Sequence, residues 1–149
     1  MENDERMKQL THNIIGACIE VHRILGPGLR EKMYRDCLCI ELELRGLAFE
    51  KEKTVFYDYK GHKMEADMRA DIIVENSVVL ELKSVVQMHP VFEAQLLSYL
   101  KVTNIPVGLL INFNVKLLKD GVIRRTLDGL GKPSPNHSFN TQAHAHEHI

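Results

Sequence analysis

The sequence predicts an α/β domain in which a mixed central β-sheet is flanked by helices. Apolar residues recur every three or four positions over residues 4–44, as they do in amphipathic helices. Residues 49–83 are instead rich in β-branched and aromatic residues and are broken by turn residues. A further helical segment precedes residues 107–113, a continuous apolar run that is typical of a strand buried on both faces.

Two helices are expected first. One covers residues 4–25 and ends at the Gly-Pro-Gly of residues 26–28, and the other covers residues 29–44 and stops at Gly46. Each has an apolar stripe, formed by Leu10, Ile14, Ala17, Cys18, Val21 and Leu25 in the first and by Met33, Cys37, Ile40 and Leu44 in the second, with Tyr34, Leu38 and Leu42 beside it.

The remaining elements are predicted from changes in the spacing of apolar residues and from turn residues. Strands are expected at residues 54–59, 63–67, 70–74 and 78–84, a helix at 90–102, and strands at 107–113 and 122–127. Pro90 suits the first turn of its helix, because the N–H groups of that turn have no hydrogen-bond partner within the helix and proline lacks one. The expected order is therefore α-α-β-β-β-β-α-β-β.

The length of 149 residues fits one domain, which we place at residues 1–130. Residues 131–149 are rich in histidine and poor in apolar residues, so a flexible tail is expected there. No apolar run approaches the ~20 residues that cross a bilayer, and the first residues are too polar for a signal peptide. We therefore expect a cytoplasmic protein that does not bind membranes and whose three cysteines are buried thiols.

The formal net charge of −1 argues against a protein that coats nucleic acid by bulk electrostatics. It does not exclude an enzyme that acts on nucleic acid. Such an enzyme needs only a local basic rim, and an acidic metal site lowers the total charge while it binds a cation.

The most informative motif is an aspartate followed by a Glu-x-Lys triplet, formed by Asp71, Glu81 and Lys83. Residues two apart in a strand project to the same face, so Glu81 and Lys83 should stand side by side. Pairing Asp71 with Glu81 across a three-residue loop, residues 75–77, and Ile73 with Val79, places Asp71 on the same face. A slip of one residue would move Asp71 to the opposite face.

Two carboxylates held together repel each other and favour a hard divalent cation, here Mg²⁺, with Mn²⁺ as the alternative. Lys83 can then orient or help to deprotonate the attacking water and stabilise charge on phosphoryl oxygens. This chemistry is phosphodiester hydrolysis. The motif alone is equally compatible with a surface strand on which Glu81 and Lys83 form an exposed ion pair, worth at most ~1 kcal/mol.

The segment Gly28-Leu29-Arg30-Glu31-Lys32-Met33-Tyr34 matches the motif of the GxxExxY family, a group of small proteins that resemble PD-(D/E)XK nucleases. The segments EVHRILGPGLREKMY, RADIIVENSVVLELKSV, HPVFEAQLLSYLKVTN and VGLLINFNV resemble that family in the same order, over roughly residues 8–127. The resemblance implies a restriction-endonuclease-like core and nuclease activity. Ala70 stands where the superfamily motif has its proline.

The resemblance also implies roles for residues outside the triplet. Glu31 corresponds to a helix carboxylate that reaches the metal site, although it also suits a helix N-terminus as an ordinary surface residue. Gln95 and Tyr99 resemble the Gln-x-x-x-Tyr motif that lies beside the active site in related nucleases, with an exposed amide and a half-buried tyrosine as the alternative. Tyr99, Arg69 and His89 are candidate substrate contacts, with an ordinary loop role as the alternative for His89.

The resulting hypothesis is a Mg²⁺-dependent nuclease that acts on DNA or RNA. Asp71, Glu81 and Glu31 would bind the metal, and Lys83, Glu31 and Gln95 would take part in catalysis. The alternatives are an inactive nuclease-fold module that binds nucleic acid or protein, and a structural subunit that acts with a partner. No long basic arm is evident in the sequence, so the grip on substrate is expected from the sheet face, its loops, a homodimer or another protein.

Overall fold

The computed structural model describes residues 2–127, so the expected tail lies outside the described residues. Its elements, in order, are α1 (Glu2–Leu25), α2 (Glu31–Leu44), β1 (Phe49–Tyr59), β2 (His62–Val74), β3 (Val78–Lys83), α3 (Pro90–Thr103), β4 (Val107–Asn112), the 3-10 helix η1 (Leu118–Gly121) and β5 (Val122–Thr126). The predicted order is confirmed, with residues 63–67 and 70–74 joined in the single strand β2. No helix in this part of the chain is long and apolar enough to cross a membrane.

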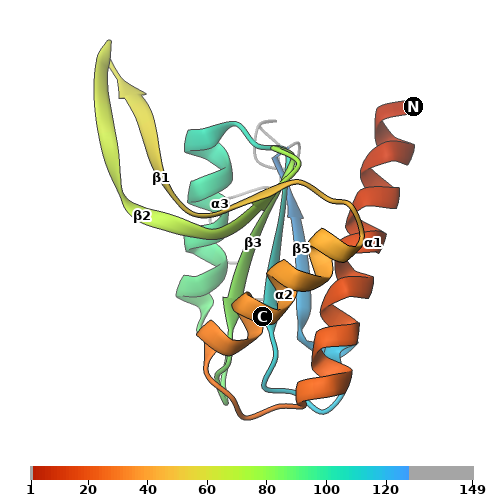
Figure 1. The fold of residues 1–149 in the computed structure, drawn as a ribbon. Helices are drawn as coiled ribbons and strands as arrows, with labels where there is room; N and C mark the ends of the chain where they lie inside the picture. The colour runs from red at the N-terminus through yellow and green to blue at the C-terminus, as the bar shows by residue number, and fades with distance from the viewer. Residues whose placement is uncertain (1, 128–149) are drawn as a thin grey trace, which may run out of the picture.

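The five strands form one mixed sheet in the order β1-β2-β3-β4-β5. Neighbouring strands are antiparallel except β3 and β4, which are parallel and joined through α3. Helices α1 and α2 cover one face of the sheet and α3 covers the other (Figure 1). Every residue of β4 is buried, as the continuous apolar run predicts for a strand covered on both sides.

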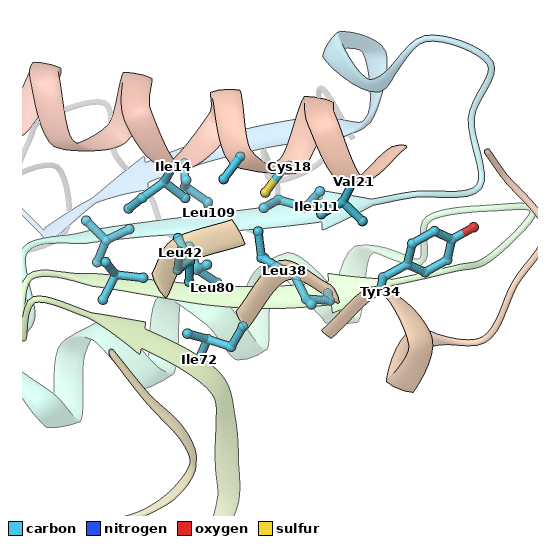
Figure 2. Close-up of a cluster of buried hydrophobic side chains, with 14 of the residues drawn as sticks. Ile14, Cys18, Val21, Tyr34, Leu38, Leu42, Ile72, Leu80, Leu109 and Ile111 are labelled. Carbon is cyan, nitrogen blue, oxygen red and sulfur yellow. The ribbon is translucent and has the colours of Figure 1, made fainter. Parts of the chain in front are cut away.

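The larger core lies between the sheet and the first two helices (Figure 2). Its labelled side chains are Ile14, Cys18 and Val21 from α1, Tyr34, Leu38 and Leu42 from α2, and Ile72, Leu80, Leu109 and Ile111 from the strands. All three cysteines are free thiols, and Cys18 and Cys39 are buried as expected, whereas Cys37 is only partly buried. Burial raises the pKa of Cys18 to about 12, so this side chain stays a neutral thiol.

The face that α2 presents to the core differs from the predicted stripe. Met33, Ile40 and Leu44 are exposed, whereas the core takes the adjoining stripe that begins at Tyr34. Both stripes have helical spacing, so periodicity alone does not distinguish them. The choice depends on tertiary packing, because the Tyr34 ring stacks on Phe113 with ring centroids 4.4 Å apart.

The β2–β3 hairpin has the predicted register. Ile73 pairs with Val79 and Val74 pairs with Val78, and residues 75–77 form the three-residue loop between the strands. Glu75 and Asn76 at the turn both have a φ of +53°. The side chain of Glu75 also accepts a hydrogen bond of 2.8 Å from the Ala48 N–H, which ties the loop to the start of β1.

Strands β1 and β2 continue well past the rest of the sheet and form a two-stranded extension that projects away from the body of the molecule (Figure 1). We call residues 55–68 the arm. The pairing register shifts between Thr54 and Phe56, where the arm begins, and then runs to the pair Tyr59 and His62 at the tip. The sequence analysis did not predict an arm of this length, and its charges are mixed rather than basic.

Candidate active site

The predicted site residues gather where β2 separates from β3. The ladder between these strands ends at Leu80, so the next N–H groups of β3 on that side, those of Leu82 and Ser84, have no strand partner. Side-chain carboxylates accept hydrogen bonds from these N–H groups instead. The Leu82 N–H donates to Asp71 Oδ2 at 2.7 Å, and the Ser84 N–H donates to Glu31 Oε2 at 3.2 Å. The two N–H groups that these carboxylates accept lie roughly 7 Å apart along the chain.

Asp71 and Glu81 are both largely buried and influence each other's ionisation. Burial and the negative charge of Asp71 together raise the pKa of Glu81 to about 8, although Lys83 partly offsets the two effects. Burial also raises the pKa of Asp71, and the Leu82 N–H and Arg35 act in the opposite direction. The pair therefore retains a proton at pH values where isolated carboxyls have lost theirs.

Lys83 lies beside these carboxyls and interacts with an aromatic ring of α3. Its Nζ is 4.2 Å from the centroid of the Phe92 ring, a cation–π contact. No ion pair within 4.0 Å joins Lys83 to Glu81 or to another carboxylate of residues 2–127, so the alternative of an exposed Glu81–Lys83 ion pair is wrong. The ammonium thus remains able to bind an anion.

Arg35 and Glu52 complete the charged cluster, and the sequence analysis missed both. Nη1 of Arg35 is 3.7 Å from Asp71 Oδ1, and its Nη2 is 3.3 Å from Glu52 Oε2. Arg35 lies one turn after Glu31 on the same face of α2, so helical spacing offered a signal for it. Glu52 lies between residues paired with Ala70 and Ile72, which places it opposite Asp71.

The backbone of Glu52 has a φ of +52° within β1. A left-handed conformation costs a non-glycine residue on the order of 1–3 kcal/mol and is found most often beside functional sites. The β-strand propensities of the surrounding residues do not predict this left-handed conformation.

Glu31 is positioned by the turn before α2. The Tyr34 hydroxyl donates to the Gly26 carbonyl at 2.6 Å and accepts from the Leu29 N–H at 3.1 Å. Tyr34 thus packs its ring in the core and holds the turn with its hydroxyl. Gly28 has a φ of +97°, a conformation that favours glycine. The G-x-x-E-x-x-Y spacing therefore has a structural reason, since its glycine and tyrosine shape the turn that presents its glutamate.

The other predicted residues lie around this centre. Tyr99 is only 1% exposed, and burial and the negative charge of Glu81 raise its pKa to about 12. At this burial the side chain is not open to a substrate, and its hydroxyl has no hydrogen-bond partner among the described residues. Gln95 is exposed and makes no hydrogen bond within residues 2–127. His89 caps α3 by accepting the Val91 N–H at 3.0 Å, and Arg69 is exposed at the base of the arm.

Within the described residues, no three His, Cys, Asp or Glu side chains are arranged to hold a metal ion as they stand. The donor set nevertheless suits a hard divalent cation. Asp71 and Glu81 supply carboxylate oxygens in a desolvated setting, and a cation there would relieve the repulsion between their charged forms.

A family model described as the PD-(D/E)XK nuclease superfamily matches residues 8–125 of the chain. No curated protein sequence matches the chain at a significant level. Among solved structures, the crystal structure of SSO0001 is similar, with a TM-score of 0.44 and 19% identity over 64% of this chain and 48% of that chain. The chain thus spans about half the length of that protein.

Proposed function

The chain belongs to the PD-(D/E)XK nuclease superfamily, and from this premise we propose that it is a metal-dependent nuclease that hydrolyses phosphodiester bonds in DNA or RNA. The observation that carries the proposal is the convergence of Glu31, Asp71, Glu81 and Lys83 at the point where β2 leaves β3. Within the superfamily we assign the chain to the GxxExxY group. The turn that Tyr34 fixes beside Glu31 supports this assignment.

Members of this superfamily generally use divalent metal ions. Asp71 and Glu81 would hold Mg²⁺ or Mn²⁺, and Glu31 would add a third carboxylate after release of the Ser84 N–H. When bound, the ion would supply positive charge for the phosphate and lower the pKa of a water molecule. Lys83 adds its own charge for the phosphoryl oxygens, and the contact with Phe92 limits where its ammonium can lie.

Four further residues would support this centre or contact the substrate. Tyr99, buried beside Glu81, is a positioning residue, whereas Arg69 and His89 lie at the surface, where a substrate backbone can reach them. Gln95, one turn before Tyr99 on α3, is exposed and free to contact the substrate backbone. Residues 1–130 would form the single domain that carries all these groups.

A second candidate function is a nuclease-fold module that binds nucleic acid or protein without cleavage. Asp71 and Glu31 each use one carboxylate oxygen to accept a backbone N–H, and Arg35 already provides Asp71 with a counter-charge. These contacts stabilise the site without a metal ion. A homodimer or another protein partner would then supply any activity.

Cleavage assays distinguish the two candidates. Single-stranded, duplex and structured DNA and RNA are incubated with Mg²⁺ or Mn²⁺ and with the wild type, Asp71→Ala, Lys83→Ala or the arm-surface control Glu65→Gln. A nuclease requires cleavage by the wild type and by Glu65→Gln that EDTA abolishes and that the other two variants lose. Equal residual activity in all four proteins would indicate contamination and refute the proposed site.

Calorimetric titration with Mn²⁺ tests the metal site without substrate. The wild type should show one saturable site that Asp71→Ala lacks. Absence of both saturable binding and cleavage in the wild type would favour the non-catalytic module.

A further inference from the structure

The arm has two faces of different composition. Residues that pair directly across antiparallel strands project to the same face. One face carries the pairs Tyr57–Met64 and Tyr59–His62, and the other carries the pairs Phe56–Glu65 and Asp58–Lys63. All of the acidic side chains in these four pairs therefore lie on one face. We call the face with Tyr57, Tyr59, His62 and Met64 the tyrosine face.

The tyrosine face lies on the side of the sheet that α3 covers, which is also the side of Glu81 and Lys83. Val55 packs in the core cluster beneath α3, and Tyr57 and Tyr59 follow it at steps of two along β1. Ile73 and Val79 belong to the same cluster, and Asp71 and Glu81 each lie two residues from one of them. Strand β2 thus runs from the tyrosine face to Asp71 over roughly 20 Å.

The tip of the arm combines this aromatic surface with positive charge. Residues 59–63 contain no acidic residue, and they carry Lys60 and His62 beside the tyrosine face. Lys63 lies on the opposite face, with its Nζ 4.7 Å from the centroid of the Phe56 ring. Asp58, the nearest carboxylate, accepts a hydrogen bond of 3.2 Å from the Gly61 N–H and is thereby held in the turn. Lys60 Nζ lies 5.6 Å from the centroid of the Tyr59 ring, so an aromatic platform and a cation stand side by side.

We propose that the tyrosine face binds unpaired nucleic acid, with bases stacked on Tyr57 and Tyr59 and phosphates near Lys60. The inference deepens the proposed function and rests on it. Aromatic side chains beside cations suit single strands, because every free base offers a face for stacking. A strand held there would run along β2 toward Asp71, which would make single-stranded or frayed nucleic acid the preferred substrate.

A second copy of the chain fits the tyrosine face less well. A stable interface between proteins takes about 800 Å² from each partner. The tyrosine face consists of four side chains on a two-stranded ribbon, with Tyr57 partly covered by its neighbours, and offers far less than that area. Unpaired bases need only the exposed rings.

The arm itself provides a matched control for the test. Tyr59 is 59% exposed and Phe56 is 50% exposed, so the two rings are similar in size and exposure but lie on opposite faces. A fluorescein-labelled single-stranded oligonucleotide and its blunt duplex are titrated with the wild type, Tyr59→Ala and Phe56→Ala in EDTA, which prevents cleavage. Thermal unfolding verifies that both variants fold.

We expect Tyr59→Ala to weaken single-strand binding about tenfold and Phe56→Ala to change it less than about twofold. The duplex should bind more weakly than the single strand. Tyrosine fluorescence gives a second measurement, because the chain has no tryptophan and Tyr34 and Tyr99 are buried. Single-stranded DNA should therefore quench emission from the arm in the wild type, and quench it less in Tyr59→Ala.

Equal single-strand affinity of the two variants would overturn the inference, as would equal binding of duplex and single strand by all three proteins. A dimer in light scattering that Tyr59→Ala dissociates, without any effect on DNA, would assign the tyrosine face to a second copy and also overturn it. Different results would refute the proposed nuclease function and the proposed role of the arm. Tyrosine-dependent binding without cleavage would refute nuclease activity, whereas cleavage by a Tyr59→Ala protein with unchanged affinity would refute only the role of the arm.

Discussion

Replacement of Glu81 by glutamine keeps the size of the side chain and removes its ability to ionise. In the folded protein, burial and the charge of Asp71 raise the pKa of Glu81 from its ordinary value of 4.5 to about 8. A carboxyl whose folded pKa is raised contributes stability that is fully present below its unfolded pKa and is lost as the pH rises through its folded pKa. The metal-free wild type should therefore lose stability between about pH 4.5 and pH 8.

The size of the effect follows from the two pKa values. A difference of about 3.5 pH units, at ~1.4 kcal/mol per unit, sets an upper limit of about 5 kcal/mol on the free energy of unfolding that is lost. Asp71 and Glu81 titrate as a pair, so we expect roughly half of this limit, or 2–3 kcal/mol. Glu81→Gln should retain that stability and unfold about 5–10 °C above the wild type at pH 9.

Thermal unfolding in EDTA, followed by circular dichroism at about pH 5, 7 and 9, measures the difference. Glu65→Gln is the control, because it removes a similar charge from an exposed position of the arm. Melting temperatures of the wild type and Glu81→Gln that run parallel over this range would refute the reasoning. Mn²⁺ should stabilise the wild type at pH 8 and leave Glu81→Gln unaffected, which links the same side chain to the metal.

Three further changes test other parts of the site and fold. Arg35→Gln removes a guanidinium 3.7 Å from Asp71 and should tighten Mn²⁺ binding at least about fivefold in calorimetry, since that charge repels a cation; weaker binding would contradict this. Tyr34→Phe breaks two hydrogen bonds to the turn before α2. It should lower the free energy of unfolding, measured by urea denaturation, by about 1–3 kcal/mol, and it should also lower the rate of cleavage. Gly108→Ala places a Cβ 2.7 Å from the Leu96 side chain and should lower the free energy of unfolding by about 1–3 kcal/mol. An unchanged melting temperature would contradict this and show that the Leu96 side chain moves aside.

The hairpin register was predictable because two simple constraints agree there. A strand period of two places Glu81 and Lys83 on one face, and a three-residue loop then determines which residues of β2 pair with β3. The helices were predictable for the same kind of reason, since their boundaries coincide with Gly46 and Pro90. Local rules therefore sufficed wherever contacts are close in sequence.

The missed features depend on contacts between distant segments. Arg35 meets Asp71 and Glu52 only after α2 packs against the sheet, and Phe92 meets Lys83 only after α3 covers the opposite face. The buried stripe of α2 was ambiguous for the same reason. Residues 55–68 form an arm because β1 and β2 pair beyond the point where neighbouring strands stop, a property that strand propensity does not encode.

The capped N–H groups of β3 have a consequence for spectroscopy. The amide proton of Leu82 lies outside the regular ladder, yet Asp71 accepts it at 2.7 Å. Its chemical shift and its rate of exchange with solvent should therefore follow the ionisation of the coupled Asp71–Glu81 pair. The Ser84 amide donates to Glu31, so its resonance should shift if a bound cation draws that carboxylate away. Two backbone resonances thus report on the two hydrogen bonds separately during a titration with Mg²⁺, with no label placed in the site.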